Sequence, residues 1–217
     1  MQRLEEIKFN DMPSGFKCKE YTDSDIKKIV YQGVEGAYSH IVTQTLFPDA
    51  DTENVNTFED AINSVLNGVA SYCVVPIENS SAGIVTDIFD LLLKKDVVIV
   101  AEYDLHISHC LLGVRGAKLG DIKTVYSHPQ ALMQCSAYLK EHSGWSQISL
   151  LNTAVSAKKV RDDKDISQAA IASRLSGDLY DLDVLDEGIN RNANNTTRFV
   201  VLSKDKIFSK KSNKLSL

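Results

Sequence analysis

Short apolar runs alternate along the chain with segments in which apolar residues recur every three or four positions. The periodic segments predict helices at 36–47, 57–67, 85–95, 129–141 and 154–161. Alternating strands and helices predict an α/β fold with a mostly parallel sheet. The apolar runs predict a longer β-rich stretch at 97–107 and shorter strands at 28–31, 70–75, 123–126, 147–151, 183–189 and 197–202.

Two lobes explain this order of elements better than one sheet, which would need many consecutive strand–helix units. The stretch 97–107 is long enough to cross between two lobes. The length of 217 residues allows one large domain or two small ones. Because open α/β sheets bind ligands at the carboxyl ends of their strands, polar clusters just after strands are the candidate sites.

The first two such clusters lie at 33–40 and 76–83. Glycines in the first cluster allow a backbone to approach a ligand, or simply form the turn between a strand and a helix. In the second cluster, Asn79, Ser80 and Ser81 either cap the helix that follows or bind a ligand, since they offer more hydrogen-bonding groups than one cap needs.

The other two clusters lie at 127–131 and 192–199. His128 either caps the helix that Pro129 opens or serves as an acid or base, because imidazole titrates near neutral pH. The residues before Thr197 are turn formers. Arg198 enters an apolar strand, where it needs an anionic partner, and its guanidinium group suits a carboxylate.

The composition narrows the classes of function. Lys and Arg total 24 against 29 Asp and Glu, a net charge of −5, which argues against a nucleic-acid-binding protein. The four cysteines lack the spacing of a zinc site, which predicts reduced, mostly buried thiols and a cytosolic compartment. We expect no metal site, no signal peptide and no membrane span.

The two ends of the chain differ from the body. Residues 1–27 have little periodicity and are predicted to form an arm or a linker. Residues 205–217 are predicted to be a polar linker that turns into a strand near Leu215. That strand is either the start of a further domain or a frayed tail.

Four motifs in this order resemble the catalytic domain of prephenate dehydratases over about residues 28–204. They are Gly33–His40, the Pro-Ile-Glu-Asn-Ser-Ser-Ala-Gly segment that begins at Pro76, Ser127–Cys135 and Asn195–Phe199. Val34 and Ala37 stand where the family usually has Pro and Thr, so any ligand contact of that Thr hydroxyl is missing here.

The resemblance implies an α/β fold of two Rossmann-like lobes around a cleft, similar to type II periplasmic binding proteins. Lobe 1 is expected at about 28–103 plus 188–204, and lobe 2 at about 104–187. The implied reaction is the decarboxylating dehydration of prephenate to phenylpyruvate, CO2 and water in L-phenylalanine biosynthesis, without a cofactor. Arogenate dehydratase, or a non-catalytic solute-binding or sensor protein of the same fold, are the alternatives.

The resemblance also assigns the site residues. The implied catalytic residues are Thr197, Ser127 and Glu78, with Thr197 as the key one. Arg198 is expected to hold a substrate carboxylate. The other implied substrate-binding residues are Asn79, Ser80, Ser39, His128, Gln130 and Phe199. The implied partners are the small-molecule substrate and a homodimer or homotetramer, with phenylalanine as an effector where a regulatory ACT domain is present.

Overall fold

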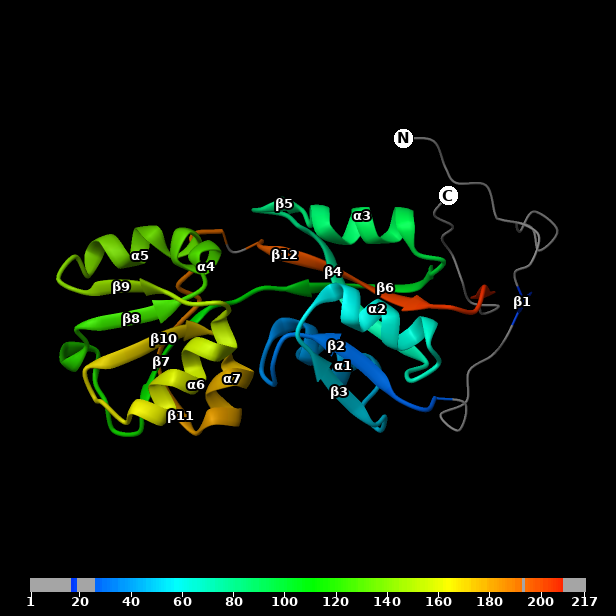
Figure 1. Cartoon of the computed structure of the whole chain (residues 1–217). Coiled ribbons are helices and arrows are strands. Elements are labelled where there is room, and N and C mark those ends of the chain that lie inside the picture. Colours follow the sequence, from blue (N-terminus) through cyan, green and yellow to red (C-terminus); the bar gives the residue numbers. More distant parts are fainter. Residues whose placement is uncertain (1–16, 19–25, 193, 209–217) are drawn as a thin grey trace.

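The computed structural model describes residues 17–18, 26–192 and 194–208. Two α/β lobes lie side by side (Figure 1). The sheet of the first lobe has the order β3 (Thr52–Val55), β2 (Ile29–Gln32), β4 (Tyr72–Asn79), β12 (Thr196–Ser203) and β6 (Val98–His106), and β5 (Gly83–Ile84) pairs with β4.

Helices cover both faces of this first sheet. Helices α2 (Phe58–Leu66) and α3 (Thr86–Lys94) pack on one face through residues such as Ile62 and Ile88, which are fully buried against alternate residues of β4 and β12. Helix α1 (Tyr38–Leu46) covers the opposite face, where Phe199 and Val201 are buried. Neighbouring residues of β12 therefore point to different sides of the sheet.

The sheet of the second lobe has the order β11 (Leu182–Glu187), β7 (Cys110–Val114), β10 (Gln168–Ala172), β8 (Thr124–Ser127) and β9 (Ser146–Ser149). A 3₁₀ turn, Leu119–Asp121, precedes β8. One face packs on α4 (Pro129–Gln134) and α5 (Ser136–Glu141), and the other on α6 (Thr153–Asp163) and α7 (Arg174–Tyr180).

Two chain segments connect the lobes, one between β6 and β7 and one between β11 and β12. They are hydrogen-bonded to each other. The Ile107 N–H donates to the Asn195 carbonyl at 2.7 Å, and the His109 N–H donates to Asn190 Oδ1 at 3.0 Å. Asn190 Nδ2 in turn donates to the Ile107 carbonyl at 3.2 Å. Any motion of one lobe relative to the other must therefore move these two hydrogen-bonded segments together or break the hydrogen bonds between them.

The turn after β2 also docks on the second lobe. The Gly36 carbonyl accepts hydrogen bonds from Ser176 Oγ at 2.9 Å and Ser173 Oγ at 3.3 Å, and Tyr180 Oη donates to the Glu35 carbonyl at 2.7 Å. Gly36 has a φ of +84°, and a Cβ there would lie 3.1 Å from Ser176 Oγ. This glycine thus allows a close approach between the lobes.

The α/β fold of two lobes around a cleft is confirmed. Helix α2 begins with a capping box formed by Thr57 and Asp60. The prediction of mostly parallel sheets is wrong, because both sheets are mixed. In the first sheet β12 runs antiparallel to β4 and β6, and in the second β7 runs antiparallel to β10 and β11. These are the strands that lead into and out of the two connections.

Other differences are local. Strand β6 ends at His106 within the first sheet instead of crossing, the predicted helix 129–141 is divided at Cys135, and β4 continues through the second polar cluster to Asn79. Among the elements that the structure describes, the pattern missed β3, β5, β7, β10 and α7. The short strands β1 (Lys17–Cys18) and β13 (Ile207–Phe208) pair in parallel, and the rest of 1–25 and 209–217, with the predicted arm and the strand near Leu215, lies outside the described residues.

Three cysteine side chains are described, and all three are buried free thiols, as predicted. Burial raises the pKa of the Cys73 and Cys135 thiols to about 12 and raises that of Cys110, so all three are protonated at neutral pH. Within the described part of the chain, no helix is long and apolar enough to cross a membrane.

Candidate active site

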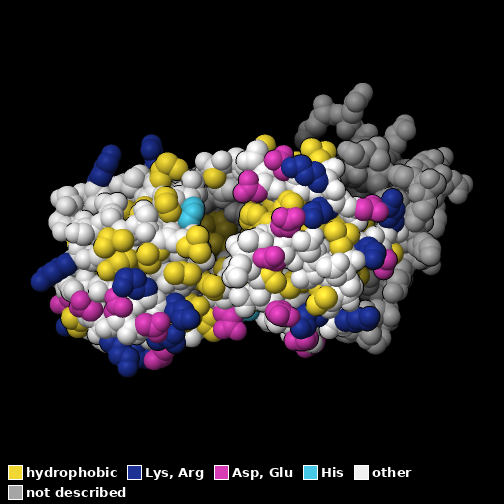
Figure 2. All heavy atoms as spheres, viewed as in Figure 1, with side chains coloured by type: hydrophobic (Ala, Val, Ile, Leu, Met, Phe, Trp, Pro, Cys, Tyr) yellow, Lys and Arg dark blue, Asp and Glu magenta, His cyan; other side chains and the backbone are white. Residues whose placement is uncertain are grey.

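A cavity of about 400 Å³ lies between the lobes, where Figure 2 shows the surface hollowed. The first lobe contributes the start of α1, the end of β4 and the start of β12, and the second lobe contributes the starts of α4 and α6. Among the described residues that line it, none is Asp, Glu, Lys or Arg. An anion in this cavity would therefore be held by uncharged donors.

Asn79 and Thr197 are hydrogen-bonded to each other across neighbouring strands in this cavity. Asn79 Oδ1 accepts the backbone N–H groups of Ser81 and Ala82, each at 2.9 Å. Its Nδ2 donates to Thr197 Oγ1 at 2.8 Å and to Asn195 Oδ1 at 3.0 Å. Since Thr197 Oγ1 already accepts from Asn79, its own proton is free to be donated into the cavity.

Six of the predicted site residues line this cavity. The six are Thr197, Asn79, Ser39, His128, Gln130 and Phe199. They come from four elements that are far apart in the sequence, and the end of β4 and the start of β12 are joined by strand pairing. Their roles toward a substrate stay predictions.

Three further predicted residues do not line the cavity. Ser127 is fully buried and donates to the Ile171 carbonyl at 2.6 Å. Ser80 Oγ accepts the Thr196 N–H at 3.0 Å, and the Ser80 N–H donates to the Thr196 carbonyl at 2.9 Å. Glu78, on β4, lies opposite Arg198 of β12. The contacts of Ser80 and Glu78 are with β12, which carries Thr197 and Phe199, and the contact of Ser127 joins β8 to β10 just before α4 begins.

Arg198 does not line the cavity, although the sequence predicted a contact with substrate. Thr197 and Phe199 face the cavity, so strand alternation turns Arg198 to the other side of β12. There its guanidinium group lies 3.0 Å from Asp104 and 3.6 Å from Glu78, the residues opposite it on β6 and β4. The anionic partners that Arg198 needs come from its own sheet.

The starts of two helices offer further donors. Helix α1 begins without a side-chain cap, and Tyr38 and Ser39 of its first turn line the cavity. Helix α6 also begins at the cavity, where Asn152 caps it by accepting the Val155 N–H at 2.8 Å. The free N–H groups and the dipole of a helix N-terminus favour an anion.

His109 links three parts of the cavity wall and had no signal in the sequence. Its Nδ1 lies 3.0 Å from the Tyr38 hydroxyl and its Nε2 lies 2.8 Å from Gln134 Oε1. With Gln134 accepting from Nε2–H, Nδ1 is the acceptor for Tyr38. Burial lowers the pKa of His109, so the ring is neutral at pH 7. Gln134 belonged to a motif that the sequence singled out, but not to its predicted site.

His128 is also neutral at pH 7. Burial lowers the pKa of His128, whose Nδ1 accepts the Gln130 N–H at 3.2 Å and so caps α4. His128 therefore caps α4 and also lines the cavity, and its role as an acid or base stays a prediction. In the described part of the chain, no group of three His, Cys, Asp or Glu residues gathers as a metal site would require.

Comparison with known proteins places this geometry in a family. The family model described as prephenate dehydratase matches residues 29–207. A bifunctional chorismate mutase/prephenate dehydratase of Buchnera aphidicola is 35% identical over 179 residues, which are 81% of this chain and 46% of that protein. An arogenate dehydratase/prephenate dehydratase of Arabidopsis thaliana is 41% identical over 183 residues, 84% of this chain and 46% of that protein.

A solved structure agrees with these relatives. The prephenate dehydratase of Arthrobacter aurescens, in complex with L-Phe, superposes with a TM-score of 0.79 at 27% identity, covering 85% of this chain and 63% of that one. The chain spans about half the length of the curated relatives it matches. With the family model covering nearly all the described residues, the chain belongs to the prephenate dehydratase family.

Proposed function

We propose that this chain carries the catalytic unit of a prephenate dehydratase, which converts prephenate to phenylpyruvate, CO2 and water in L-phenylalanine biosynthesis. The observation that carries the proposal is the Asn79–Thr197 pair, which presents a free hydroxyl proton to a cavity lined by uncharged residues. The family membership supports the same reaction.

For this reaction the protein needs to orient the substrate and to supply one proton. The bond between the ring and its carboxylate breaks, and that electron pair enters the ring. The bond between the ring and its hydroxyl breaks at the opposite carbon, and the oxygen leaves as water once it has taken up a proton. The electron pair that enters the ring is balanced by the pair that leaves with the oxygen, so no electron acceptor is needed. The ring becomes aromatic, which drives the reaction.

In this proposal Thr197 donates its hydroxyl proton to the leaving oxygen as the bond between the ring and that oxygen breaks. Thr197 Oγ1 then takes a proton back from solvent, so each turnover consumes one solvent proton. Asn79 fixes the direction of that proton, because it occupies the acceptor side of the Thr197 oxygen at 2.8 Å. General acid assistance of this kind typically contributes about 10²–10⁴-fold to a rate. Ser80, Glu78 and Ser127 act in this scheme as positioning residues that do not line the cavity.

An uncharged cavity suits the loss of CO2. A cation paired with the ring carboxylate would stabilise the charged ground state more than the neutral product, which would raise the barrier. Around the ring, Phe199 and the apolar part of the lining exclude water, and the first turns of α1 and α6 supply the dipoles that an anion needs on entry.

For the whole protein we propose a larger assembly. The membership of the two sheets supports lobe boundaries at about 28–103 plus 188–204 and about 104–187. We propose that the full-length protein acts as a cytosolic homodimer or homotetramer, and that phenylalanine is its effector where a regulatory ACT domain is present. The buried free thiols support a reducing compartment.

The test is a side-by-side assay of the purified chain with prephenate and with arogenate. We expect the wild type to form phenylpyruvate and CO2 in equal amounts from prephenate. We expect Thr197→Ala to turn over prephenate more slowly, by about a hundredfold or more. Thr45→Ala is the matched control, because Thr45 bonds only to its own helix on the surface of α1. Absence of phenylpyruvate from prephenate, with tight ligand binding retained, would instead support a non-catalytic binding protein.

A further inference from the structure

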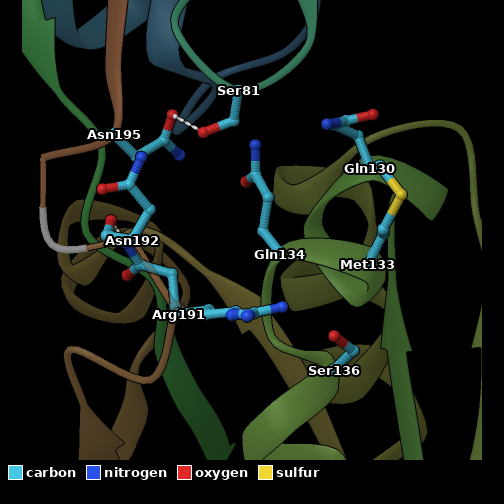
Figure 3. Close-up of a pocket in the computed structure, with 9 residues that line it drawn as sticks. Ser81, Gln130, Met133, Gln134, Ser136, Arg191, Asn192 and Asn195 are labelled. Carbon is cyan, nitrogen blue, oxygen red and sulfur yellow. Dashed lines mark hydrogen bonds between the residues drawn. The ribbon is translucent and has the colours of Figure 1, made fainter.

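A second cavity, of about 460 Å³, lies beside the first and shares Gln130 and Gln134 with it. Figure 3 shows its residues converging from the turn after β4, from α4 and α5, and from the connection between β11 and β12. Within the described part of the chain, Arg191 is the one charged residue that lines it. The remaining lining residues are Ser81, Gln130, Met133, Gln134, Ser136, Asn190, Asn192 and Asn195.

Asn195 presents an unpaired donor to this cavity. Two backbone N–H groups fix the oxygen of Asn79, so Asn79 Nδ2 must donate, and it does so to Asn195 Oδ1 at 3.0 Å. Ser81 Oγ donates to the same oxygen at 3.2 Å. The nitrogen of the Asn195 amide is therefore the free end, and it is buried without a partner in a residue that is 0% exposed. A buried unpaired donor is costly unless a ligand accepts from it.

The two glutamines add donors of the same kind. Gln130 Nε2 is buried, has no hydrogen-bond partner, and points into the cavity (Figure 3). Gln134 has its oxygen bonded to His109 at 2.8 Å, so its nitrogen is left for the cavity. Three amide nitrogens from two lobes thus face one space.

Arg191 supplies a positive charge without an ion pair. Its backbone N–H donates to the Gln134 carbonyl at 2.8 Å, and its side chain extends across the cavity toward α4 and α5 (Figure 3). The other described arginines each lie within 4.0 Å of a carboxylate, at Asp181, Asp162, Glu187 and Asp104. Only Arg191, among the arginines that the structure describes, has no such partner.

We propose that this second cavity binds the carboxylate of the 2-keto acid side chain of the substrate, through Arg191, Asn195 and Gln130. The inference rests on the proposed dehydratase function and assigns one end of the substrate. A guanidinium group and convergent amide N–H groups are complementary to a carboxylate. The side-chain carboxylate survives the reaction, so a cation can hold it tightly without opposing the loss of CO2 from the ring.

This arrangement also selects between a keto acid and an amino acid. In arogenate an ammonium group replaces the keto oxygen beside the same carboxylate. The described lining of both cavities contains no Asp or Glu to receive that ammonium group, and Arg191 would repel it. We therefore expect kcat/KM for prephenate to exceed that for arogenate by about tenfold or more.

The experiment is a kinetic comparison of Arg191→Gln with the wild type on prephenate. We expect KM to rise by about ten- to a hundredfold, with kcat within about threefold, because a hydrogen bond to a charged group is lost from substrate binding. Arg191→Lys should restore part of the loss. Arg115→Gln, which removes an exposed arginine paired with Asp181, should leave KM unchanged.

Inhibition by phenylpyruvate identifies the carboxylate, because this product has lost the ring carboxylate and kept the other. Its inhibition constant should rise in Arg191→Gln by about the same factor as KM. An unchanged KM, or a raised KM with an unchanged inhibition constant, would overturn the assignment. So would a wild-type enzyme that prefers arogenate.

Failure of the proposed reaction can be told apart from failure of this subsite. If wild-type protein makes no phenylpyruvate, calorimetric titration with phenylpyruvate still measures binding to the wild type and to Arg191→Gln. A loss of affinity confined to Arg191→Gln would support the subsite without the reaction. Equal affinity for the two proteins, or no binding to the wild type, would overturn it.

Discussion

The two faces of β12 differ in the kind of polar group they carry. On the cavity face, Thr197 is paired with the neutral amide of Asn79 at 2.8 Å. On the outer face, Arg198 lies between the carboxylates of Glu78 and Asp104 on the flanking strands. Two adjacent residues of one motif thus serve different ends. The neutral pair is suited to donate a proton, and the charged trio ties three strands together.

After the removal of Thr197 itself, the removal of Asn79 should have the largest effect on the chemistry of the cavity face. We expect Asn79→Ala to lower kcat by about a hundredfold, because the Thr197 hydroxyl loses its directing donor and the turn at Ser81 loses its acceptor. Steady-state kinetics on prephenate measures the loss. Asn67→Ala, at the exposed end of α2, is the matched control, and a kcat for Asn79→Ala equal to that control would contradict the role of the amide.

The cavity face also depends on the second lobe, which Gly36 brings close. We expect Gly36→Ala to lower the melting temperature by about 2–8 °C, since alanine at φ +84° costs about 1–2 kcal/mol and its Cβ crowds Ser176. Gly68→Ala is the control, because Gly68 has a φ of +71° and nothing within 4 Å of its Cβ position. Calorimetry should give the larger shift for Gly36→Ala, and equal shifts would mean that the approach of the lobes adds nothing.

The cavity side should also make the stability of the protein depend on pH, because His109, which lines the cavity, is buried and neutral. Its pKa is lowered by burial, so below about pH 6.5 the unfolded chain binds a proton that the folded chain does not. The free energy of unfolding should therefore fall as the pH drops from about 6.5 to 5. Denaturant titrations at several pH values should give a shallower fall for His109→Gln, and an unchanged pH dependence would remove His109 as a contributor.

The outer face should respond least. Arg198→Ala removes ion pairs whose side chains are 41–54% exposed, so solvent screening limits the loss of stability to about 1 kcal/mol or less. Since the guanidinium group does not line the cavity, KM for prephenate should stay within about threefold of the wild type. A KM raised tenfold or more would return Arg198 to the substrate-binding role that its sequence motif suggested.

The sequence predicted what periodicity encodes locally. The recurrence of apolar residues predicted helices at 57–67 and 85–95, and the apolar run at 70–75 predicted the buried part of β4. It could not predict which face of β12 meets the cavity, because alternation in a strand buried on both sides leaves no polarity pattern to read. The resemblance assigned both Thr197 and Arg198 to the site because both belong to one motif, and a motif does not say which side of the strand each side chain faces.

The sequence pattern could not predict the contacts between the lobes either. His109 joins Tyr38 and Gln134 from elements far apart in the chain, and a lone histidine carries no spacing that signals this. The mixed sheets were missed because β7, which follows β6 after only three residues, was not predicted as a strand, and because periodicity does not give the direction in which a strand runs. Where the chain turns from one sheet to the other is decided by tertiary packing.

The most direct test of the account compares kcat for Thr197→Ala and Arg198→Ala on prephenate in one experiment. We predict that kcat falls by about a hundredfold or more in Thr197→Ala and changes within about threefold in Arg198→Ala, with both variants folded. A wild-type kcat in Thr197→Ala, or a loss in Arg198→Ala as large as that in Thr197→Ala, would contradict it.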